Sequence, residues 1–361
     1  IGSANLITPG HLETMVGEAG ADFAGVCRLS LDDPDFPEKM RTGREDEIRL
    51  STHTGASLLQ GNIFGKGWAG SAQNPVFGRD DEYRIIPTRK PKTIVVVGGG
   101  SGGMEYALTA DEIGHKVVLF EKSNTLGGAM DWAGNYPGLP NMEMLRYQPQ
   151  YHRTMIAKSN VDVRLGVAAD VATIMAEKPD VVVIATGAAP VELDVAGLVE
   201  ARASGFAVRI DEVMARDNPK AVGKSVTIYG AAEGAELALD LKLRGHDVRL
   251  IDAGPAYAPA NYVGSRVWAI MGMMAFAGVS AETGLTLDSV GAGEAVFKGA
   301  DGAVTVKADT LVIASGRQPL DDLAQALAAS PVALHVVGDA REVRSYGNAI
   351  HEAAYLSRTV K

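Results

Sequence analysis

The chain has 361 residues, a formal net charge of −10 and a single cysteine, Cys27. This length is enough for two or three domains with substantial cores, which excludes a small disulfide-stabilised protein. The negative charge argues against a nucleic-acid-binding surface, because such surfaces need clustered lysine and arginine. One cysteine can form neither an internal disulfide nor the thiolate set of an iron–sulfur cluster, so the sequence favours a cytoplasmic location.

The sequence predicts no membrane partner, because no segment reaches the roughly 20 apolar residues of a membrane-spanning helix. The longest uncharged run, 267–281, is interpreted as a buried helix. Its large apolar side chains are expected to pack one helix face, and they are Trp268, Met271, Met273, Met274 and Phe276.

The N-terminal segment has the pattern of β/α repeats. It predicts a strand at 1–3, a helix at 8–19 and a short strand at 22–27. The next segment, 43–90, has little periodicity and is rich in Gly, Ser, Thr, Asn and Pro. We therefore expect a long linker there, of the kind that in compact proteins is either functional or connects domains.

A glycine fingerprint follows the apolar strand predicted at 93–97. Gly98, Gly100 and Gly103 match G-x-G-x-x-G, and a helix at 104–113, a strand at 116–120 and Glu121 come next. The three glycines allow a tight turn, the approach of a pyrophosphate and close packing of helix on strand, while the helix N-terminus presents free N–H groups to phosphate. Glu121 would accept hydrogen bonds from a ribose. The pattern favours an adenine-nucleotide site over a purely structural glycine-rich turn.

A second strand–helix–strand unit at 225–251 has a degenerate fingerprint. Aligned on Glu236, its three glycine positions become Tyr229, Ala231 and Gly234. A Cβ atom at position 231 crowds the approach of a pyrophosphate. Asp252, at the end of the following strand, would repel a 2′-phosphate. We therefore expect weak or absent NADPH binding and at best modest NADH binding in this unit.

Taken in chain order, these motifs resemble the trimethylamine dehydrogenase and 2,4-dienoyl-CoA reductase group of NADH:flavin oxidoreductases. The resemblance rests on Gly98 to Glu121 with Lys122 and Leu126-Gly127-Gly128, on Ala185-Thr186-Gly187, Gly316-Arg317 and Gly338-Asp339-Ala340, and on residues 20–28 with Asp33-Pro34-Asp35.

The resemblance implies an α/β protein in which the end of a (β/α)8 FMN barrel of the old yellow enzyme type is followed by two Rossmann-like nucleotide-binding domains, one inserted in the other. The implied division is 1–42 for the last βα units of the barrel, 43–90 for a linker with a degenerate iron–sulfur region, 91–190 with 310–361 for an FAD- or ADP-binding domain, and 191–309 for an inserted NAD-like domain.

Two groups of cofactor-binding residues are also implied by the resemblance. Gly2, Ser3 and Arg28 would hold the phosphate of an FMN shared with the rest of the barrel. FAD, or ADP in the same site, would lie on Gly98, Gly100, Gly102, Gly103, Glu121, Lys122, Gly127, Gly128, Thr186, Gly187 and Asp339, the last at the head of the final helix. No metal site is expected, and the catalytic residues of such a barrel are not in this chain.

The family binds a [4Fe-4S] cluster through cysteines, but the corresponding positions here are Ser51, Thr54, Ser57 or Leu58, and Ser71. None supplies a thiolate, so the sequence predicts that the cluster is absent.

The resemblance thus implies a component of a flavin-dependent oxidoreductase, related to amine dehydrogenases and enoate reductases and acting on a small molecule. The alternative is a non-catalytic subunit that holds ADP or FAD within a flavoprotein complex. In either case we expect an oligomer, and association with the remainder of the barrel on the same gene product or on a separate subunit.

Overall fold

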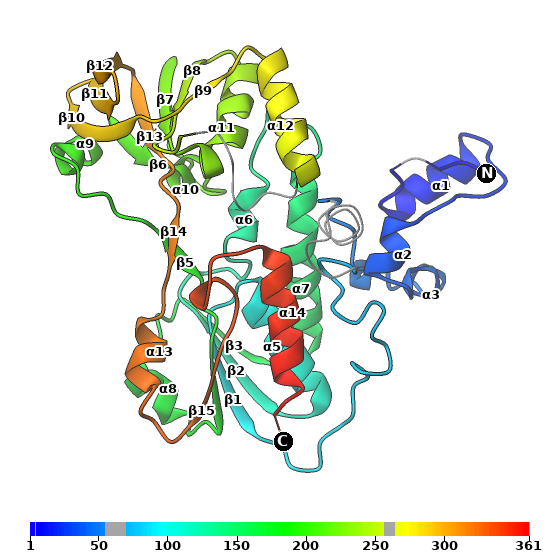
Figure 1. Ribbon diagram of the computed structural model, residues 1–361. Helices are drawn as coiled ribbons and strands as arrows, with labels where there is room; N and C mark the ends of the chain where they lie inside the picture. Colours follow the sequence, from blue (N-terminus) through cyan, green and yellow to red (C-terminus); the bar gives the residue numbers. More distant parts are fainter. Residues whose placement is uncertain (4, 55–69, 256–263, 361) are drawn as a thin grey trace. The chain divides into compact units, whose positions relative to one another are not determined.

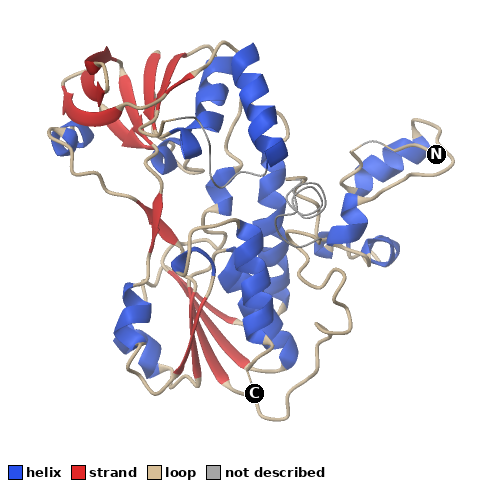
Figure 2. Ribbon diagram, viewed as in Figure 1, coloured by secondary structure: helices blue, strands red, loops and turns tan. Residues whose placement is uncertain are grey.

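The computed structural model describes residues 1–3, 5–54, 70–255 and 264–360. The chain divides into two compact α/β units, one inserted in the other (Figure 1). Unit 1 consists of Ile1–Asp131, Met144–Ala188 and Pro319–Lys361, and unit 2 of Trp132–Glu143 and Ala189–Gln318. Figure 2 shows that each unit contains a sheet flanked by helices. The predicted α/β class with Rossmann-like sheets is confirmed.

Unit 1 is built on a parallel five-stranded sheet of order β15-β4-β1-β2-β3. The strands are β1 (Thr93–Val97), β2 (Lys116–Glu121), β3 (Asp162–Leu165), β4 (Val181–Ile184) and β15 (Ala333–Val336). In β1, Ile94 and Val96 belong to one hydrophobic core, whereas Val95 and Val97 belong to the core on the opposite face. This two-sided burial explains why the strand is a continuous apolar run.

Helices cover both faces of this sheet (Figure 1). One core contains side chains from α5 (Ser101–Ile113), α7 (Tyr147–Lys158) and α14 (Tyr346–Ser357), and the other contains side chains from α8 (Val171–Ala176) and α13 (Asp322–Leu327). Helix α5 begins three residues earlier than the sequence predicts, because the last glycines of the fingerprint adopt helical geometry.

The N-terminal part of unit 1 contains α1 (Pro9–Gly17), α2 (Arg28–Asp32), α3 (Phe36–Arg41) and the 3₁₀ turn η1 (Glu45–Glu47). Thr8 caps α1, near the predicted start of that helix. The two predicted strands are represented by one parallel bridge between Gly2 and Ala24. The barrel end therefore stays a prediction, since a strand of a parallel barrel needs neighbours on both edges to form its ladder.

Unit 2 has a second parallel sheet, of order β6-β13-β7-β8-β9, and an antiparallel sheet, β10-β11-β12. Their strands are β6 (Ala207–Arg209), β7 (Ser225–Tyr229), β8 (Asp247–Ile251), β9 (Ala281–Glu282), β13 (Thr310–Ile313), β10 (Thr286–Gly291), β11 (Glu294–Gly299) and β12 (Gly302–Lys307). The helices are α9 (Leu198–Ala203), α10 (Ile210–Val213), α11 (Ala231–Leu243) and α12 (Gly264–Phe276).

Helix α12 differs from its prediction as a buried helix. Ile270 and Met274 are buried in the core, but Trp268, Met271, Met273 and Phe276 are exposed, Phe276 at 96%. One stripe of the helix packs and the rest faces outward, which a run without charges does not reveal.

Short elements complete the fold: β5 (Ala188–Pro190), which pairs with β14 (Arg317–Pro319), α6 (Met130–Ala133), and the 3₁₀ turns η2 (Met142–Arg146) and η3 (Gly338–Ala340). Among the helices that the structure describes, none has the length and apolar character needed to cross a membrane.

Candidate functional site

The turn after β1 requires glycine at two of its positions. Gly98 has φ +108°, and a Cβ atom there would collide with the backbone carbonyl of Ala185 after β4. A Cβ atom at Gly103 would collide with the carbonyl oxygen of Gly98. These contacts show the tight turn and the close helix–strand packing that the fingerprint predicts.

Gly100 is different because a Cβ atom there would make no close contact. It has φ −78°, and a Cβ atom placed on it would have the Cα of Gly128 as its nearest heavy atom, 4.0 Å away. Gly100 is also the N-cap of α5 and offers no side-chain cap, while the first helical bond runs from Met104 N to its carbonyl at 2.9 Å. The first turn of α5 thus has no side-chain cap, and the Cβ position beside it is free of close contacts, an arrangement suited to phosphate.

Glu121 ends β2 directly beside this turn and is 8% exposed. One carboxylate oxygen accepts a hydrogen bond from Gly99 N at 2.7 Å, and the other accepts from the backbone and hydroxyl of Ser123 at 2.8 and 2.7 Å. Glu121 therefore braces the turn in addition to its predicted role at a ribose. Lys122, the next residue, is exposed.

The loop carrying Gly127 and Gly128 packs against the same turn. Gly127 N donates to Gly99 O at 2.9 Å, and a Cβ atom on Gly128 would come within 2.9 Å of Gly100. Arg153 of α7 holds this loop by donating to Leu126 O and, at 2.6 Å, to Asp131.

Thr186, Gly187 and Asp339 lie at the same edge of the sheet, because they follow the parallel strands β4 and β15. The Thr186 hydroxyl donates to Leu320 O at 2.5 Å. Asp339 does not lie at the head of the final helix, as expected, but in η3; α14 begins at Tyr346 and is capped by Ser345. The strand order thus brings the predicted dinucleotide residues together at one edge, and their contact with a nucleotide stays a prediction.

Sequence reasoning missed Glu352 of α14, which supports this edge. Its carboxylate accepts from Gly338 N at 3.0 Å and also pairs with Arg344. No local signal marks it, since the bond joins residues on different elements.

The predicted FMN-phosphate residues lie apart from that edge in the chain's N-terminal segment. Arg28 is the first residue of α2 rather than part of a strand, is exposed, and donates to Asn5 at 3.0 Å. Gly2 forms the bridge to Ala24, and Ser3 is exposed. Their role at FMN stays a prediction.

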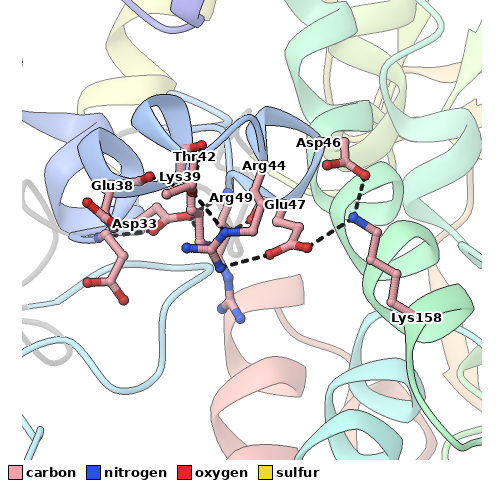
Figure 3. Close-up of polar contacts among 10 residues, drawn as sticks. Asp33, Glu38, Lys39, Thr42, Arg44, Asp46, Glu47, Arg49 and Lys158 are labelled. Carbon is pink, nitrogen blue, oxygen red and sulfur yellow. Dashed lines mark hydrogen bonds and ion pairs between the residues drawn. The ribbon is translucent and has the colours of Figure 1, made fainter.

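The residues after α3 are anchored within unit 1 by charged side chains (Figure 3). Lys39 donates to the buried Asp33 at 2.6 Å and to Glu47 O at 2.9 Å. Lys158 of α7 pairs with Asp46 at 2.5 Å and with Glu47 at 3.0 Å. In the Asp33-Pro34-Asp35 motif, Asp33 therefore has a structural role, because it pairs with Lys39 of α3.

Some of the positions that correspond to the iron–sulfur ligands lie inside the described residues and others lie outside them. Ser57 and Leu58 lie outside the described residues. The Ser71 hydroxyl donates to Asp32 and accepts from the amides of Gln73 and Asn74 at 3.0 and 2.8 Å. Burial raises the pKa of the Asp32 carboxyl, an effect that hydroxyl donors and Arg49 oppose.

A cavity of about 40 Å³ lies among these groups, enough for a few water molecules. Its lining includes Ser51, His53 and Thr54, while the hydroxyls of Thr52 and Thr54 lie 2.8 and 3.3 Å from the Tyr346 hydroxyl of α14. Burial, followed by the charge of Arg28, lowers the pKa of His53 to about 4. The described positions thus supply hydroxyl groups where the family has thiolates, and the absence of a [4Fe-4S] cluster stays a prediction. Within the described ranges, no group of three or more His, Cys, Asp or Glu side chains could hold a metal ion.

The turn of unit 2 corrects our alignment of the second fingerprint. Tyr229 is the last residue of β7 and packs against Phe297, with ring centroids 5.8 Å apart, so it does not obstruct the turn. Gly230, with φ +108°, matches Gly98 in geometry, but α11 begins directly after it. Asp252 accepts from Ala231 N at 2.6 Å and so occupies the first amide of α11.

The comparisons with known proteins agree with this geometry. A family model described as pyridine nucleotide-disulphide oxidoreductase matches residues 143–339, and one described as FAD binding domain matches residues 93–178. The chain belongs to the pyridine nucleotide-disulphide oxidoreductase family. This membership and the FAD-binding match support an oxidoreductase that uses FAD.

Known proteins resemble this chain over nearly its whole length. NADH oxidase of Thermoanaerobacter brockii is 31% identical over 342 residues, which are 93% of this chain and 51% of the relative. A 2-naphthoyl-CoA reductase complex with 2-naphthoyl-CoA has a TM-score of 0.88 at 26% identity and covers 99% of this chain and 54% of its own. Histamine dehydrogenase from Rhizobium sp. 4-9, with a TM-score of 0.80, 21% identity and coverage of 100% and 55%, shows the shared fold.

The chain spans about half the length of these proteins. The predicted resemblance to the trimethylamine dehydrogenase and 2,4-dienoyl-CoA reductase group is confirmed.

Proposed function

We propose that this chain is the nucleotide-binding portion of a flavin-dependent oxidoreductase related to amine dehydrogenases and enoate reductases, and that FAD occupies the turn after β1. The observation that carries the proposal is the contrast within the fingerprint. Gly98 and Gly103 have no room for a side chain because protein atoms fill the space, whereas a Cβ atom on Gly100, at the uncapped N-terminus of α5, would meet no heavy atom closer than 4.0 Å.

The residues around the turn fit an adenine dinucleotide in order along the sheet edge. The first amides of α5 would bind its phosphates, and Glu121 would bind the ribose. Thr186, Gly187 and Asp339 would lie on the flavin side. Bound FAD supplies two-electron redox chemistry, and these residues would bind and orient it.

The proposal extends to FMN and to the part of the relatives that the given sequence does not cover. Arg28, with Gly2 and Ser3, would hold the phosphate of FMN together with the remaining barrel strands, since a guanidinium suits phosphate oxygens. Such an enzyme would operate without a [4Fe-4S] cluster, because Ser51, Thr54 and Ser71 have no thiolate. NADH binding in unit 2 would be weak, because alanines follow Gly230 and α11 begins directly after it, so that the turn offered to phosphate is shorter than the one in unit 1.

Denaturing the freshly purified protein and identifying the released nucleotide tests the proposal. We expect FAD, a yellow protein, and bleaching on addition of NADH. Nucleotide release without bleaching would favour the alternative, a non-catalytic subunit that holds FAD or ADP. Protein without any nucleotide, and without affinity for added FAD or ADP, would refute both. Stoichiometric iron and acid-labile sulfide would refute the absence of the cluster.

A further inference from the structure

The phosphate-binding turn is held by backbone hydrogen bonds to Glu121 and Gly127, and it has one side chain, Ser101, that gives the protein a further hold on it. Residues 98–103 are five glycines and Ser101. A glycine-rich segment loses more conformational entropy on ordering than other sequences do. Ser101 is 8% exposed, and its hydroxyl donates to Gln148 Oε1 of α7 at 2.9 Å.

A second contact joins the same two helices one turn further along. His152 Nε2 lies 2.9 Å from Glu105 Oε2. Ser101 and Glu105 are four residues apart on α5, and Gln148 and His152 are four apart on α7, so each pair lies on one helix face. We call these four residues the α5–α7 ladder.

The directions of the hydrogen bonds along the ladder follow when His152 is neutral and its Nδ1 carries no proton; a protonated Nδ1 would instead donate to the carbonyl oxygen of Gln148, 3.0 Å away. An ionised Glu105 can only accept, so His152 donates through Nε2, and its Nδ1 can accept from Gln148 Nε2 at 2.9 Å. That bond turns Gln148 Oε1 toward Ser101. The hydroxyl of Ser101 is thus oriented by a chain that ends at a buried carboxylate.

A charge from the linker balances that carboxylate. Burial opposes ionisation of Glu105, but the Arg49 guanidinium, 3.7 Å away, together with His152 and the charge of Arg358, lowers its pKa below the usual range. Arg49 is itself fixed over the ring of Tyr151, at 4.4 Å from the centroid, and donates to its hydroxyl at 3.2 Å. The ladder is therefore a completed network, with Gln148 and His152 fully buried.

We propose that Gln148, His152 and Glu105 are positioning residues that hold the phosphate-binding turn in its binding conformation through the hydroxyl of Ser101. The inference rests on the proposed function, since the turn is the FAD site proposed above. Without the ladder, a nucleotide would have to order the glycine-rich turn at the expense of its binding free energy.

Titration calorimetry with the nucleotide-free chain tests this inference, with ADP and adenosine as probes. Ser101→Ala and Gln148→Met each remove the tether, and each should weaken ADP binding roughly 5- to 10-fold, the equivalent of one hydrogen bond. Adenosine has no phosphate, so its affinity should be unchanged. The double variant should bind ADP with the affinity of the more weakly binding single variant, because both changes remove the same hydrogen bond.

Gln150→Met is the matched control, because Gln150 lies on the same helix but is exposed; its ADP affinity should equal that of the wild type. A second measurement, hydrogen exchange under native conditions, should show that exchange of a peptide covering 98–105 is faster in Ser101→Ala than in the wild type, by more than in peptides distant from the turn. This keeps the inference testable if Gln148→Met fails to fold.

The outcomes separate the two proposals. A wild-type chain that binds neither ADP nor FAD would overturn the proposed function and the inference with it. Wild-type binding combined with unchanged ADP affinity in Ser101→Ala would overturn the inference alone. Equal losses for ADP and adenosine would also overturn it, because they would indicate general damage rather than loss of phosphate positioning.

Discussion

Alanine at Gly100 should weaken nucleotide binding without destabilising the fold. The backbone at Gly100 is in a region open to any residue, φ −78° and ψ −174°, and its Cβ would lie 4.0 Å from the nearest heavy atom, an ordinary van der Waals contact. We therefore expect Gly100→Ala to change the free energy of unfolding by less than about 1 kcal/mol, with a stabilising contribution from the less flexible unfolded chain.

The effect on binding should be large because the new methyl group enters the space beside the α5 amides. A methyl carbon projects about 1.5 Å from the Cα atom, enough to separate a phosphate oxygen from one or two amide groups. Each charge-assisted hydrogen bond contributes about 1.5 to 3 kcal/mol. The expected loss of ADP affinity is therefore at least roughly 10-fold, for one weak bond, and up to roughly 20,000-fold, for two strong bonds.

Gly103→Ala is the comparison that separates binding from folding. Its Cβ would overlap the Gly98 carbonyl oxygen, so the backbone must shift, at a cost of about 1 to 3 kcal/mol or more. Thermal unfolding of the nucleotide-free protein should show a melting temperature lower by several degrees for this variant only. Wild-type ADP affinity in Gly100→Ala, or a melting temperature reduced as much as in Gly103→Ala, would refute the reasoning.

Three further variants test individual features. Gly272→Ala in α12, where a Cβ meets no atom within 4 Å, should stabilise unit 2 by up to about 1 kcal/mol in chemical denaturation, because alanine is the better helix former. His53→Asn should flatten the pH dependence of stability between pH 6.5 and about 4. In that range wild-type His53 is protonated only in the unfolded chain, so the wild type loses stability as the pH falls. Because solvent screens this half-buried group, we expect the wild type to lose about 1 kcal/mol of unfolding free energy through His53. Ser71→Ala should cost roughly 2 kcal/mol at pH 7, because the ionised Asp32 loses a donor, and less at a pH low enough to protonate Asp32.

These three expectations have distinct contrary results. Unchanged or lower stability of Gly272→Ala would show that the α12 surface is not as open as described. A pH profile of His53→Asn parallel to that of the wild type would assign the acid sensitivity to other groups. A deficit in Ser71→Ala that grows on acidification would contradict the Asp32 contact.

The parts of the site that could be predicted depend on short-range signals. The apolar run of β1, the glycines that follow and Glu121 at the end of β2 all lie within 29 residues, and each position has a steric or hydrogen-bonding reason for its residue type. The parallel order of the strands then determines which later segments share that edge. Thr186 and Gly187 follow from this rule, because β4 is the neighbour of β1.

Other features depend on tertiary packing and left no such signal. Aligning the second fingerprint on Glu236 assumed a turn as long as the first, but α11 begins directly after Gly230, which moves Tyr229 into the core. Which side chains of α12 are buried depends on which face of the helix its neighbours cover, and the uncharged sequence does not reveal that face. Ser101 and Gln148 are 47 residues apart, so no sequence pattern joins them.

The pairing of β15 with β4 has a consequence for how the protein is made. Val181 of β4 is synthesised before the whole of the 189–318 segment of unit 2, whereas its partner Ala333 is synthesised after it. During translation, the β4 edge of the unit 1 sheet therefore stays unpaired until β15 has been synthesised. Helix α5 likewise has no contact with α14, which packs on it in the folded protein, until the end of synthesis. Non-local parallel pairing of this kind is slow and leaves apolar surface and strand edges exposed. Unit 2 is contiguous apart from residues 132–143, so the nascent chain would acquire its inner unit first and complete the edge of the dinucleotide sheet last.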